Sequence, residues 1–582
     1  MAGLEQTGAD LMQACGLPAA WAGKAQWRVL ASGAGAPMNF LAAWHAWKAD
    51  PHRPRMLHFL LIEPLPVSAD ELVRAASSHP ELAALADELA AQWFGLMPGS
   101  HRLAFEQGRV LLTVHVNELS PVLRRESFVA DSVLLGAVDA TSVKALSRHC
   151  ERGARFAALT ASQEALRELG RCGFAVPASA QPNPVVAGEF LPAWEPKQRA
   201  RVRAAMPSTC IVIGAGLAGS AVAASLARRG WDVCVLDSAA QPASGASGAP
   251  VAMLAPHFSP DDSMLSKLSR AGVRMTLQQV REHLVEGEDF GVTGVLELRE
   301  ALHEIRAHEF KSAEEPWCRP ASGDDLKRAA AGTDAQGLWH VQAAWIKPAA
   351  LVSAWLAQPK VQWRANCRVA RCQRDGDTGE WIVADAHGNE LGRAALVVVA
   401  AALESGSLAG TELPLQPVRG QISWGTQPTG DLPPFPVNGN GHFIPAVPVA
   451  GDTAWFCGST FDRGDSSMRA REEDNAANHA RLRDLLPSAA AAVEHEFTNR
   501  SVRAWAGVRC ASSNRRPLVG QVQPGLWLST AMGSRGLTFC VLCAEVLAAQ
   551  LHDEPLPIEA RLANALAPTT PNTPARAVAL AR

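Results

Sequence analysis

The chain has 582 residues, of which 48% are hydrophobic and 19% are charged, and its formal net charge is −3. This length predicts two or more domains, because a single hydrophobic core stops growing at about 250–300 residues. The near-zero charge excludes a global basic field, so a nucleic-acid partner would have to be met by a local patch.

Membrane, secretory and disulfide-rich classes are also excluded. Apolar stretches such as ALVVVAAAL, residues 395–403, are too short to span a bilayer, and MAGLEQTGAD carries neither a basic nor an apolar signal region. A cytoplasmic location is therefore expected. The 12 cysteines show no spacing of a disulfide framework or zinc site. Cys540 and Cys543 lie in an apolar helical pattern, which favours two core residues over a redox pair.

Residues 1–190 are predicted to form an α/β domain with a mostly parallel sheet. Strand-like and helix-like segments alternate from Trp27, and one pair reads as a hairpin. These segments are WRVLAS, NFLAAWHAWK, LHFLLIE, the hairpin HRLAFEQGRVLLTVHV, DSVLLGAV, TSVKALSRHC and ARFAALTAS.

A linker is predicted at residues 191–207, where Pro, Ala and basic residues accumulate. It carries Lys197, Arg199, Arg201 and Arg203. A solvated linker is the favoured interpretation, and a contact with phosphates is the alternative.

The second domain, residues 208–566, opens with a dinucleotide-binding fingerprint. A buried strand, CIVIG, leads into Gly214, Gly216 and Gly219, which form GxGxxG at the start of the helix SAVAASLARRG. The first glycine makes the turn, the second lets the backbone approach a pyrophosphate, and the third packs helix on strand. Asp237 ends the next strand, WDVCVLD, about where a ribose-binding acid belongs, so FAD or NAD is expected rather than NADP.

FAD is favoured over NAD because a second glycine turn enters a helix near the carboxyl end. This turn is GSRGLT, residues 533–538, and its helix N-terminus would hold the far end of a long cofactor or a negative charge. Residues 293–450 mix strand-like pieces, including VQWRANCRVARC and GEWIVADA, which suits a substrate-covering sheet inserted into the nucleotide-binding frame. The tail, residues 567–582, is predicted to be disordered.

Six motifs in this domain resemble the D-amino acid oxidase and glycine oxidase class of flavoproteins. More specifically, they resemble the oxidoreductase half of the bifunctional tRNA 5-methylaminomethyl-2-thiouridine biosynthesis family. The motifs are GASG (245–248), APHFSPDDSMLSKLSRAG (from Ala255), QPVRGQISW (from Gln416), NGNGHFIPAV (from Asn438), GSTFDRGD (from Gly458) and GSRGLT. FDRGD matches no known nucleotide-binding pattern, so it supports the family assignment through the resemblance alone.

The resemblance implies an FAD-dependent amine oxidoreductase acting on the carboxymethylaminomethyl group of a tRNA wobble uridine. The CH2 of the glycine-like arm would give a hydride to the flavin, and water would split the resulting imine into glyoxylate and an aminomethyl uridine. Arg509 matches the position of the arginine that binds the substrate carboxylate, and Arg419, Arg535 and His442 are further candidates. The implied FAD contacts are Gly214, Gly216, Gly219, Asp237, Gly245, Ser247, Gly533, Ser534, Arg535, Gly536 and Leu537.

The first domain resembles the class I methyltransferase half of the same family. Gly33, Gly35, Asn39 and Glu63 match positions that would hold S-adenosylmethionine.

The chain departs from the family pattern in this domain. Ala31 stands at an acid position and Pro37 at a glycine position. Gly136, Ala137 and Val138 replace an Asp-Gly-Phe stretch whose loop is missing, and ASAQPNPVVAG stands where a Lys-Arg-containing strand is expected. Three interpretations of this domain stay open: an active methyltransferase with altered residues, a domain that binds the cofactor but reacts slowly, or a retained scaffold that helps to dock tRNA. Impaired or lost methyl transfer is favoured, because two groups that would usually serve the transfer are absent.

Two rival functions remain open from the sequence. One is a free glycine- or sarcosine-type amino acid oxidase, and the other is a tRNA-binding scaffold that keeps FAD for stability. Salt-dependent binding of tRNA would distinguish a tRNA-modifying enzyme from a free amino acid oxidase, which needs no tRNA-binding surface. No metal is expected, and the oligomeric state is left open, with a monomer compatible.

Overall fold

The computed structural model describes residues 7–33, 35–177, 185–195, 204–299, 310–332 and 334–568. The chain divides into two compact units, residues 1–206 with 549–563, and residues 207–548 with 564–582. Lys197, Arg199, Arg201 and Arg203 of the expected linker, and all but the first two residues of the expected tail, lie outside the described residues.

The first unit is built around an eight-stranded sheet with the order β3-β4-β2-β1-β5-β6-β8-β7. The pairs from β4 to β6 are parallel, and β3, β8 and β7 pair antiparallel with their neighbours. The strands are β1 (Gln26–Ser32), β2 (Met56–Ile62), β3 (Gly99–Phe105), β4 (Val110–Val116), β5 (Ala130–Val138), β6 (Cys150–Ala161), β7 (Phe174–Ala175) and β8 (Val186–Phe190).

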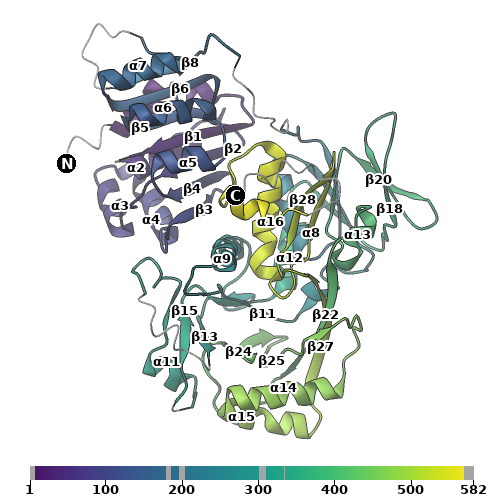
Figure 1. Ribbon diagram of the computed structural model, residues 1–582. Coiled ribbons are helices and arrows are strands. Elements are labelled where there is room, and N and C mark those ends of the chain that lie inside the picture. The colour runs from purple at the N-terminus through teal and green to yellow at the C-terminus, as the bar shows by residue number, and fades with distance from the viewer. Residues whose placement is uncertain are drawn as a thin grey trace. The chain divides into compact units, whose positions relative to one another are not determined.

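Helices cover both faces of this sheet, as Figure 1 shows in purple and blue. One buried cluster joins the strands to α1 (Thr7–Ala14), α2 (Ala36–Ala49), α3 (Ala69–Ala76) and α4 (Ala83–Gln92). The other joins them to α5 (Leu119–Arg125), α6 (Ala140–Leu146) and α7 (Gln163–Arg171). All seven residues of β2 are buried, as expected for a strand covered on both faces. The expected α/β class is confirmed.

Strand β8, which lies between β6 and the edge strand β7, corrects one detail of the sequence analysis. A strand is retained within the segment ASAQPNPVVAG and the residues after it, because Val186–Phe190 pairs antiparallel with β6. The strand carries neither Lys nor Arg.

Residues 549–563 belong to the first unit, although the sequence reading assigned them to the second domain. Backbone carbonyls of this segment accept hydrogen bonds from Gln26 (3.1 Å, to His552) and Arg102 (2.7 Å, to Pro555). Such contacts between residues more than 400 positions apart leave no local signal in the sequence.

The second unit contains the nucleotide-binding frame, a six-stranded sheet with the order β17-β10-β9-β21-β29-β28. All pairs are parallel except β28 with β29. The strands are β9 (Thr209–Ile213), β10 (Asp232–Leu236), β17 (Val361–Arg364), β21 (Leu396–Val399), β28 (Leu518–Gln523) and β29 (Leu526–Thr530). The helices of this unit are α8 (Leu217–Arg228), α9 (Met264–His283), α11 (Gly323–Arg328), α12 (Pro348–Leu356), α13 (Ser405–Leu408), α14 (Glu472–Leu485), α15 (Pro487–Thr498) and most of α16 (Gly536–His552). The last residues of α16, 549–552, and residues 560–563 of α17 (Ala560–Asn564) belong to the first unit.

A nine-stranded mixed sheet forms the other layer of the second unit, with the order β14-β15-β13-β23-β24-β25-β22-β26 and with β27 also paired to β22. Figure 1 shows α14 and α15 side by side against this sheet. Its strands are β13 (Val295–Leu298), β14 (Cys318–Pro320), β15 (Gly337–His340), β22 (Leu415–Gly425), β23 (Val437–Gly439), β24 (Gly441–Val449), β25 (Asp452–Gly458), β26 (Asp462–Arg463) and β27 (Arg503–Ser512).

The mixed sheet differs from the expected insertion at residues 293–450. It reaches Ser512, whereas two segments expected in it belong elsewhere. VQWRANCRVARC supplies β17, which pairs with β10 of the nucleotide-binding sheet, and GEWIVADA supplies β19 of a separate sheet. That sheet has the order β18-β19-β20, and a further one has the order β11-β16-β12. Their strands are β18 (Arg371–Arg374), β19 (Trp381–Ala384), β20 (Glu390–Ala394), β11 (Ala252–Leu254), β12 (Phe290–Gly291) and β16 (Ala344–Ile346).

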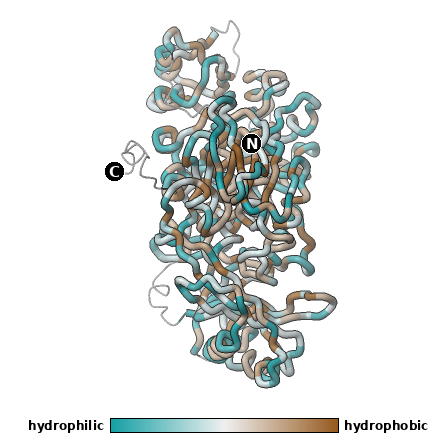
Figure 2. The backbone as a smooth tube through the Cα atoms, turned by 90° about the vertical axis from the view of Figure 1, so that its right-hand side faces the viewer, coloured by the Kyte–Doolittle hydropathy of each residue, from teal (hydrophilic) through white to brown (hydrophobic). Residues whose placement is uncertain are grey.

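The core follows the hydrophobic pattern of the sequence. Figure 2 shows the hydrophobic segments, in brown, mostly in the interior and the hydrophilic segments mostly at outer turns. Cys540 and Cys543 are fully buried on α16 as free thiols, which confirms their interpretation as core residues. Among the described residues, every helix is too short or too polar to cross a membrane.

A buried ion pair joins α8 to α16. The Glu545 carboxylate accepts hydrogen bonds from Arg228 (2.8 Å), Arg229 (2.9 Å) and the Ser225 hydroxyl (2.7 Å). Burial alone would raise the pKa of Glu545, but the two guanidiniums outweigh it and hold the pKa well below its usual range.

Replacing Glu545 with glutamine is expected to lower the free energy of unfolding by about 3–5 kcal/mol, because two arginines lose their buried partner. Urea denaturation, monitored by the fluorescence of the chain's 17 tryptophans, measures this loss. The stabilisation by Glu545 is present above its unfolded pKa of about 4.3 and is lost as the pH falls toward the folded value, so Glu545→Gln should flatten the acid limb of the stability curve.

The matched control is Glu390→Gln, which breaks an exposed ion pair with Arg393 (3.0 Å) and should cost under about 1 kcal/mol. Equal losses in the two variants would contradict the structural role of Glu545.

Candidate functional site

A cavity of about 940 Å³ lies inside the second unit, between the nucleotide-binding sheet and the mixed sheet. Residues from both sheets line it, together with the first turns of α8 and α16. The sequence candidates in its lining are Gly214, Gly216, Asp237, Gly245, Ser247, His442, Arg509, Gly533, Ser534, Arg535, Gly536 and Leu537. Of the candidates from this domain, Gly219 and Arg419 are not in the lining.

The glycine fingerprint forms the turn from β9 into α8. Gly214 has a φ of +111°, and a Cβ there would stand 2.6 Å from the Ala400 carbonyl oxygen. A Cβ on Gly219 would overlap the carbonyl oxygen of Gly214, so helix and strand could not pack. Gly219 therefore acts from behind the cavity wall, as the fingerprint predicts for its third glycine.

Gly216 faces the cavity at the N-terminal end of α8. A Cβ on Gly216 would stand 3.0 Å from the Ser247 hydroxyl, which also accepts a 3.0 Å hydrogen bond from the Leu217 amide. The motif GASG thus meets the fingerprint at this point. A backbone left bare of side chains at a helix N-terminus fits a pyrophosphate.

Asp237 follows the end of β10 and lines the same cavity. One carboxylate oxygen accepts a hydrogen bond from the Ala215 amide (2.7 Å) and the other from the Ala239 amide (2.8 Å). These bonds fix the carboxylate beside the fingerprint turn, and each oxygen keeps a lone pair that can accept a ribose hydroxyl.

The second glycine turn precedes α16. Gly533 has a φ of +59° and its amide donates to the Cys510 carbonyl (2.8 Å), so the turn is tied to β27. Gly536 and Leu537 open the helix at the cavity wall. Burial, with a smaller contribution from Arg515, lowers the pKa of Arg535. Two helix N-termini therefore face one cavity, which fits a long dinucleotide such as FAD.

Arg509 projects from β27 into the cavity. One terminal nitrogen, Nη2, donates to the Ser459 hydroxyl (2.6 Å). The other, Nη1, is buried and has no hydrogen-bond acceptor among the described residues. Burial lowers the pKa of Arg509, but a guanidinium stays protonated at neutral pH. A half-buried cation with an unused donor is suited to a ligand carboxylate.

Gly420 makes room for this guanidinium. On the neighbouring strand β22, a Cβ at Gly420 would stand 2.5 Å from both terminal nitrogens of Arg509. The glycine of the motif QPVRGQISW therefore positions Arg509. Sequence reasoning missed this role because the contact depends on strand pairing.

His442 lies on β24, opposite Asn438 on one side and Gly458 on the other. Burial and the nearby Arg509 guanidinium lower the pKa of His442 to about 4. The imidazole is therefore neutral at pH 7 and can accept a hydrogen bond through one ring nitrogen.

Arg419 is a correction to the sequence candidates. Its side chain is fully buried and pairs with Asp474 (2.6 Å) on α14 and with Asp462 (3.5 Å) on β26. It also donates to the Gln421 side chain (3.1 Å). The guanidinium is committed to these protein contacts and is not part of the cavity lining.

An ion pair that the sequence reading did not single out also lines the cavity. His340 Nε2 contacts Glu297 Oε2 at 2.6 Å. Burial alone would lower the pKa of His340, but Cys318 and Glu297 raise it to about 10. The one available signal was an acid inside the otherwise apolar strand GVLEL.

The methyltransferase-like candidates gather at the carboxyl edge of the first sheet. Gly33 (φ +96°) follows β1, Gly35 (φ +86°) starts α2, and Glu63 follows β2. Burial raises the pKa of Glu63. β1 lies between β2 and β5, where the strand order reverses, and this is the position at which such sheets bind ligands. Asn39 is buried in the first turns of α2.

The departures from the family pattern lie at the same edge. Gly136 packs against Gly33, since a Cβ on Gly33 would stand 3.4 Å from its Cα. β5 continues through Val138 and α6 starts after Asp139, so no long loop separates them. The Asp139 carboxylate caps α6, accepting from the Thr141 amide (3.1 Å) and the Thr141 hydroxyl. The acid that follows β5 is therefore engaged in a helix cap.

Comparisons with known proteins agree with this geometry. A family model described as "FAD dependent oxidoreductase" matches residues 209–550. The tRNA 5-methylaminomethyl-2-thiouridine biosynthesis bifunctional protein MnmC of Polaromonas naphthalenivorans (strain CJ2) is 47% identical over 601 residues, covering 98% of this chain and 94% of that protein. The protein of the same name from Delftia acidovorans (strain DSM 14801 / SPH-1) is 46% identical over 610 residues, covering 97% and 95%.

A solved structure shows the same fold for the second unit. Glycine oxidase from Geobacillus kaustophilus superposes with a TM-score of 0.51 at 19% identity, covering 62% of this chain and 98% of that chain. FAD is therefore the cofactor of the second unit. The chain belongs to the FAD dependent oxidoreductase family through residues 209–550 and, along nearly its whole length, to the family of tRNA 5-methylaminomethyl-2-thiouridine biosynthesis bifunctional proteins.

Proposed function

We propose that this chain oxidises the carboxymethylaminomethyl group on a tRNA wobble uridine, giving the aminomethyl uridine and glyoxylate. The observation that carries the proposal is the half-buried Arg509, which lines the same cavity as the glycine fingerprint and whose buried Nη1 has no hydrogen-bond partner among the described residues. A carboxylate at the end of the uridine's arm is the ligand that this cation favours.

FAD, when bound, accepts the two electrons and the hydrogen that leave the CH2 group of the substrate arm. Gly214, Gly216 and Asp237 would hold its pyrophosphate and ribose. The first turn of α16 would face its other end. Arg509 would bind the carboxylate and orient the arm, and neutral His442 would accept a hydrogen bond from the substrate amine.

We propose that the first unit is an impaired methyltransferase. Gly33, Gly35, Asn39 and Glu63 would form the S-adenosylmethionine site. Transfer to the amine also needs a group that orients the amine or accepts its proton. Gly136 offers no such group, and Asp139 is engaged in the cap of α6. We therefore expect little or no methylaminomethyl product.

The tRNA would be modified in the cytoplasm, and a monomer suffices because one unit contains the whole oxidase cavity.

Anaerobic mixing of the FAD-loaded chain with an anticodon stem-loop RNA that carries the modified uridine tests the oxidase. Loss of flavin absorbance is expected with this RNA, with a rate that falls as salt is added, and far less with free glycine or sarcosine. Bleaching by the free amino acids alone would favour a free amino acid oxidase. Bleaching by neither would favour a tRNA-binding scaffold that keeps FAD for stability.

A further inference from the structure

The motif FDRGD belongs to an exposed segment beside the cavity, Ser459 to Arg471, which joins β25 to α14 through the short strand β26. We call it the 459–471 segment. Neither the dinucleotide fingerprint nor the carboxylate site explains its composition, which combines an exposed aromatic residue with several charges.

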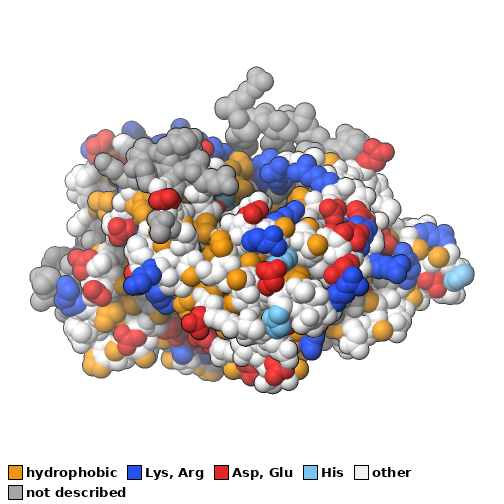
Figure 3. All heavy atoms as spheres, turned by 90° about the horizontal axis from the view of Figure 1, so that it is seen from below, with side chains coloured by type: hydrophobic (Ala, Val, Ile, Leu, Met, Phe, Trp, Pro, Cys, Tyr) orange, Lys and Arg blue, Asp and Glu red, His pale blue; other side chains and the backbone are white. Residues whose placement is uncertain are grey.

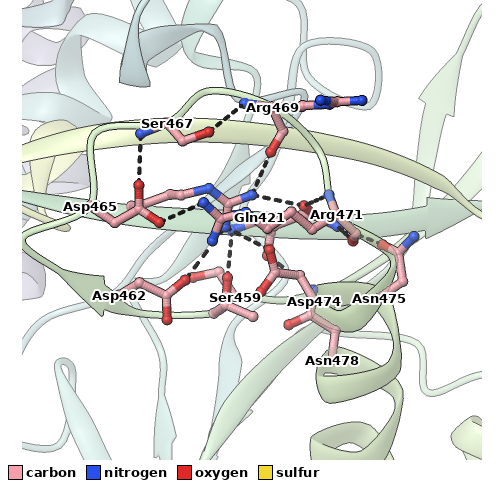
Figure 4. A network of polar contacts seen from close by, with 12 residues as sticks. Gln421, Ser459, Asp462, Asp465, Ser467, Arg469, Arg471, Asp474, Asn475 and Asn478 are labelled. Atoms are coloured by element: carbon pink, nitrogen blue, oxygen red, sulfur yellow. Dashed lines mark hydrogen bonds and ion pairs between the residues drawn. The ribbon is translucent and has the colours of Figure 1, made fainter.

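The 459–471 segment is anchored to β22 by partly buried polar contacts (Figure 4). Arg419 donates to the Arg469 carbonyl (2.7 Å). The Gln421 side chain donates to the Arg471 carbonyl (2.7 Å) and accepts from the Arg471 amide (2.8 Å). At the other end, the Gly464 amide donates to the Pro417 carbonyl (3.0 Å). These contacts tie the backbone of the segment to β22 at both ends.

The acidic residues of the segment are already paired, whereas two of its arginines are not. Asp462 faces Arg419 (3.5 Å) and Asp465 pairs with Arg471 (2.7 Å). Arg463 and Arg469 are exposed and have no carboxylate partner among the described residues. Figure 4 shows the Arg469 side chain extending away from the network. The segment therefore offers two unneutralised cations to a partner.

Phe461 stands at the cavity wall with 49% of its surface exposed. The Arg463 guanidinium lies 5.9 Å from the centre of its ring, and that of Arg509 lies 5.8 Å from it. An aromatic ring next to a substrate-binding cation, flanked by an unpaired arginine, matches the way that proteins bind unstacked RNA bases.

The face of the molecule seen in Figure 3 carries no broad basic patch to which RNA could bind instead. Basic side chains there are interspersed with acidic ones rather than forming a field of one sign. With a net charge of −3, recognition must come from local cations.

We propose that the 459–471 segment binds a single-stranded RNA loop, with Phe461 stacking on a base at the cavity mouth and with Arg463 and Arg469 contacting backbone phosphates. This inference rests on the proposed tRNA function and names residues that recognise the RNA. A base unstacked from the loop gains the ring of Phe461 as a new stacking partner, which offsets the cost of unstacking. The modified arm is then directed toward Arg509.

Fluorescence anisotropy with a labelled, unmodified anticodon stem-loop RNA and the FAD-loaded full chain tests the inference. Phe461→Ala should raise Kd about 10-fold at every salt concentration, and Phe461→Trp should restore binding, because stacking tolerates any aromatic ring. Met468→Ala is the matched control: Met468 is 53% exposed in the same segment but does not line the cavity, so Kd should not change.

The charge variants give a second, independent readout. Arg463→Gln and Arg469→Gln should each weaken binding and reduce the slope of log Kd against log salt by about 1, whereas Phe461→Ala should leave this slope unchanged. Flavin absorbance should be unchanged in all five variants, which shows that the cavity is intact.

Wild-type affinity in Phe461→Ala, or an equal loss in Met468→Ala, would overturn the inference. If the wild-type chain itself shows no salt-dependent binding of the RNA, the proposed tRNA function fails as well. If the wild type binds and oxidises the modified RNA while Phe461→Ala does so equally well, only the role of the 459–471 segment fails.

Discussion

Replacing Arg509 with alanine is expected to raise KM for the carboxymethylated RNA by about 10- to 100-fold while the chain keeps its FAD. Charge-assisted hydrogen bonds to a carboxylate contribute about 1.5–3 kcal/mol, and each 1.4 kcal/mol is a factor of 10 in affinity. FAD should remain because the fingerprint, Asp237 and the first turn of α16 do not depend on this side chain. Steady-state kinetics, with the flavin content measured by absorbance, checks both halves of the expectation.

Gly420→Ala provides a second test of the same cation without removing its charge. The added Cβ would stand 2.5 Å from both terminal nitrogens of Arg509 and must displace them. KM should therefore rise in this variant too, with FAD retained. If Arg509→Ala loses FAD as readily as it loses substrate, the residue supports the cofactor site and does not bind the carboxylate.

Gly216→Val is expected to abolish FAD retention, so that the purified chain is colourless. The valine side chain would project where the backbone of α8 is left bare, and its Cβ would already stand 3.0 Å from the Ser247 hydroxyl. A pyrophosphate could then no longer approach the helix N-terminus. The ratio of flavin to protein absorbance measures the loss.

The matched control is Gly376→Val, in the exposed turn between β18 and β19, where a Cβ meets open space. This variant should remain yellow. A yellow, FAD-loaded Gly216→Val protein would contradict the assignment of the fingerprint to the pyrophosphate.

The features that could be predicted from the sequence are local ones. Gly214, Gly216 and Gly219 have fixed spacing within one strand, turn and helix, and their conformation depends on neighbours in the chain. The same is true of the turn at Gly533 and of the burial of Cys540 and Cys543, which follows from the apolar pattern of one helix.

The features that sequence reasoning missed depend on pairing between distant strands. Arg419 and Arg509 looked alike as candidates, because both lie in conspicuous motifs. β22 and β27 pair so that Val418 faces Arg509, and Arg419 is buried against Asp474 instead. Gly420 and Phe461 lie close to Arg509 only because distant strands pair in this sheet. Neither role can therefore be predicted from one segment of the sequence.

The first unit illustrates the opposite case, in which a matching fold carries altered site residues. Its strand order and its glycine turn after β1 are retained, whereas Gly136 and the cap at Asp139 occupy the edge where the amine would be methylated. Fold and activity are separate properties in such a domain, because a few side chains decide the chemistry.

Mass spectrometry of wobble nucleosides tests the central claim most directly. The purified, FAD-loaded chain is incubated with undermodified tRNA carrying the carboxymethylaminomethyl group, with and without S-adenosylmethionine. We expect the aminomethyl nucleoside and glyoxylate in both reactions, and no methylaminomethyl nucleoside in either. A methylaminomethyl product would show that Pro37 and Gly136 are compatible with methyl transfer, and an unchanged carboxymethylaminomethyl nucleoside would contradict the oxidase itself.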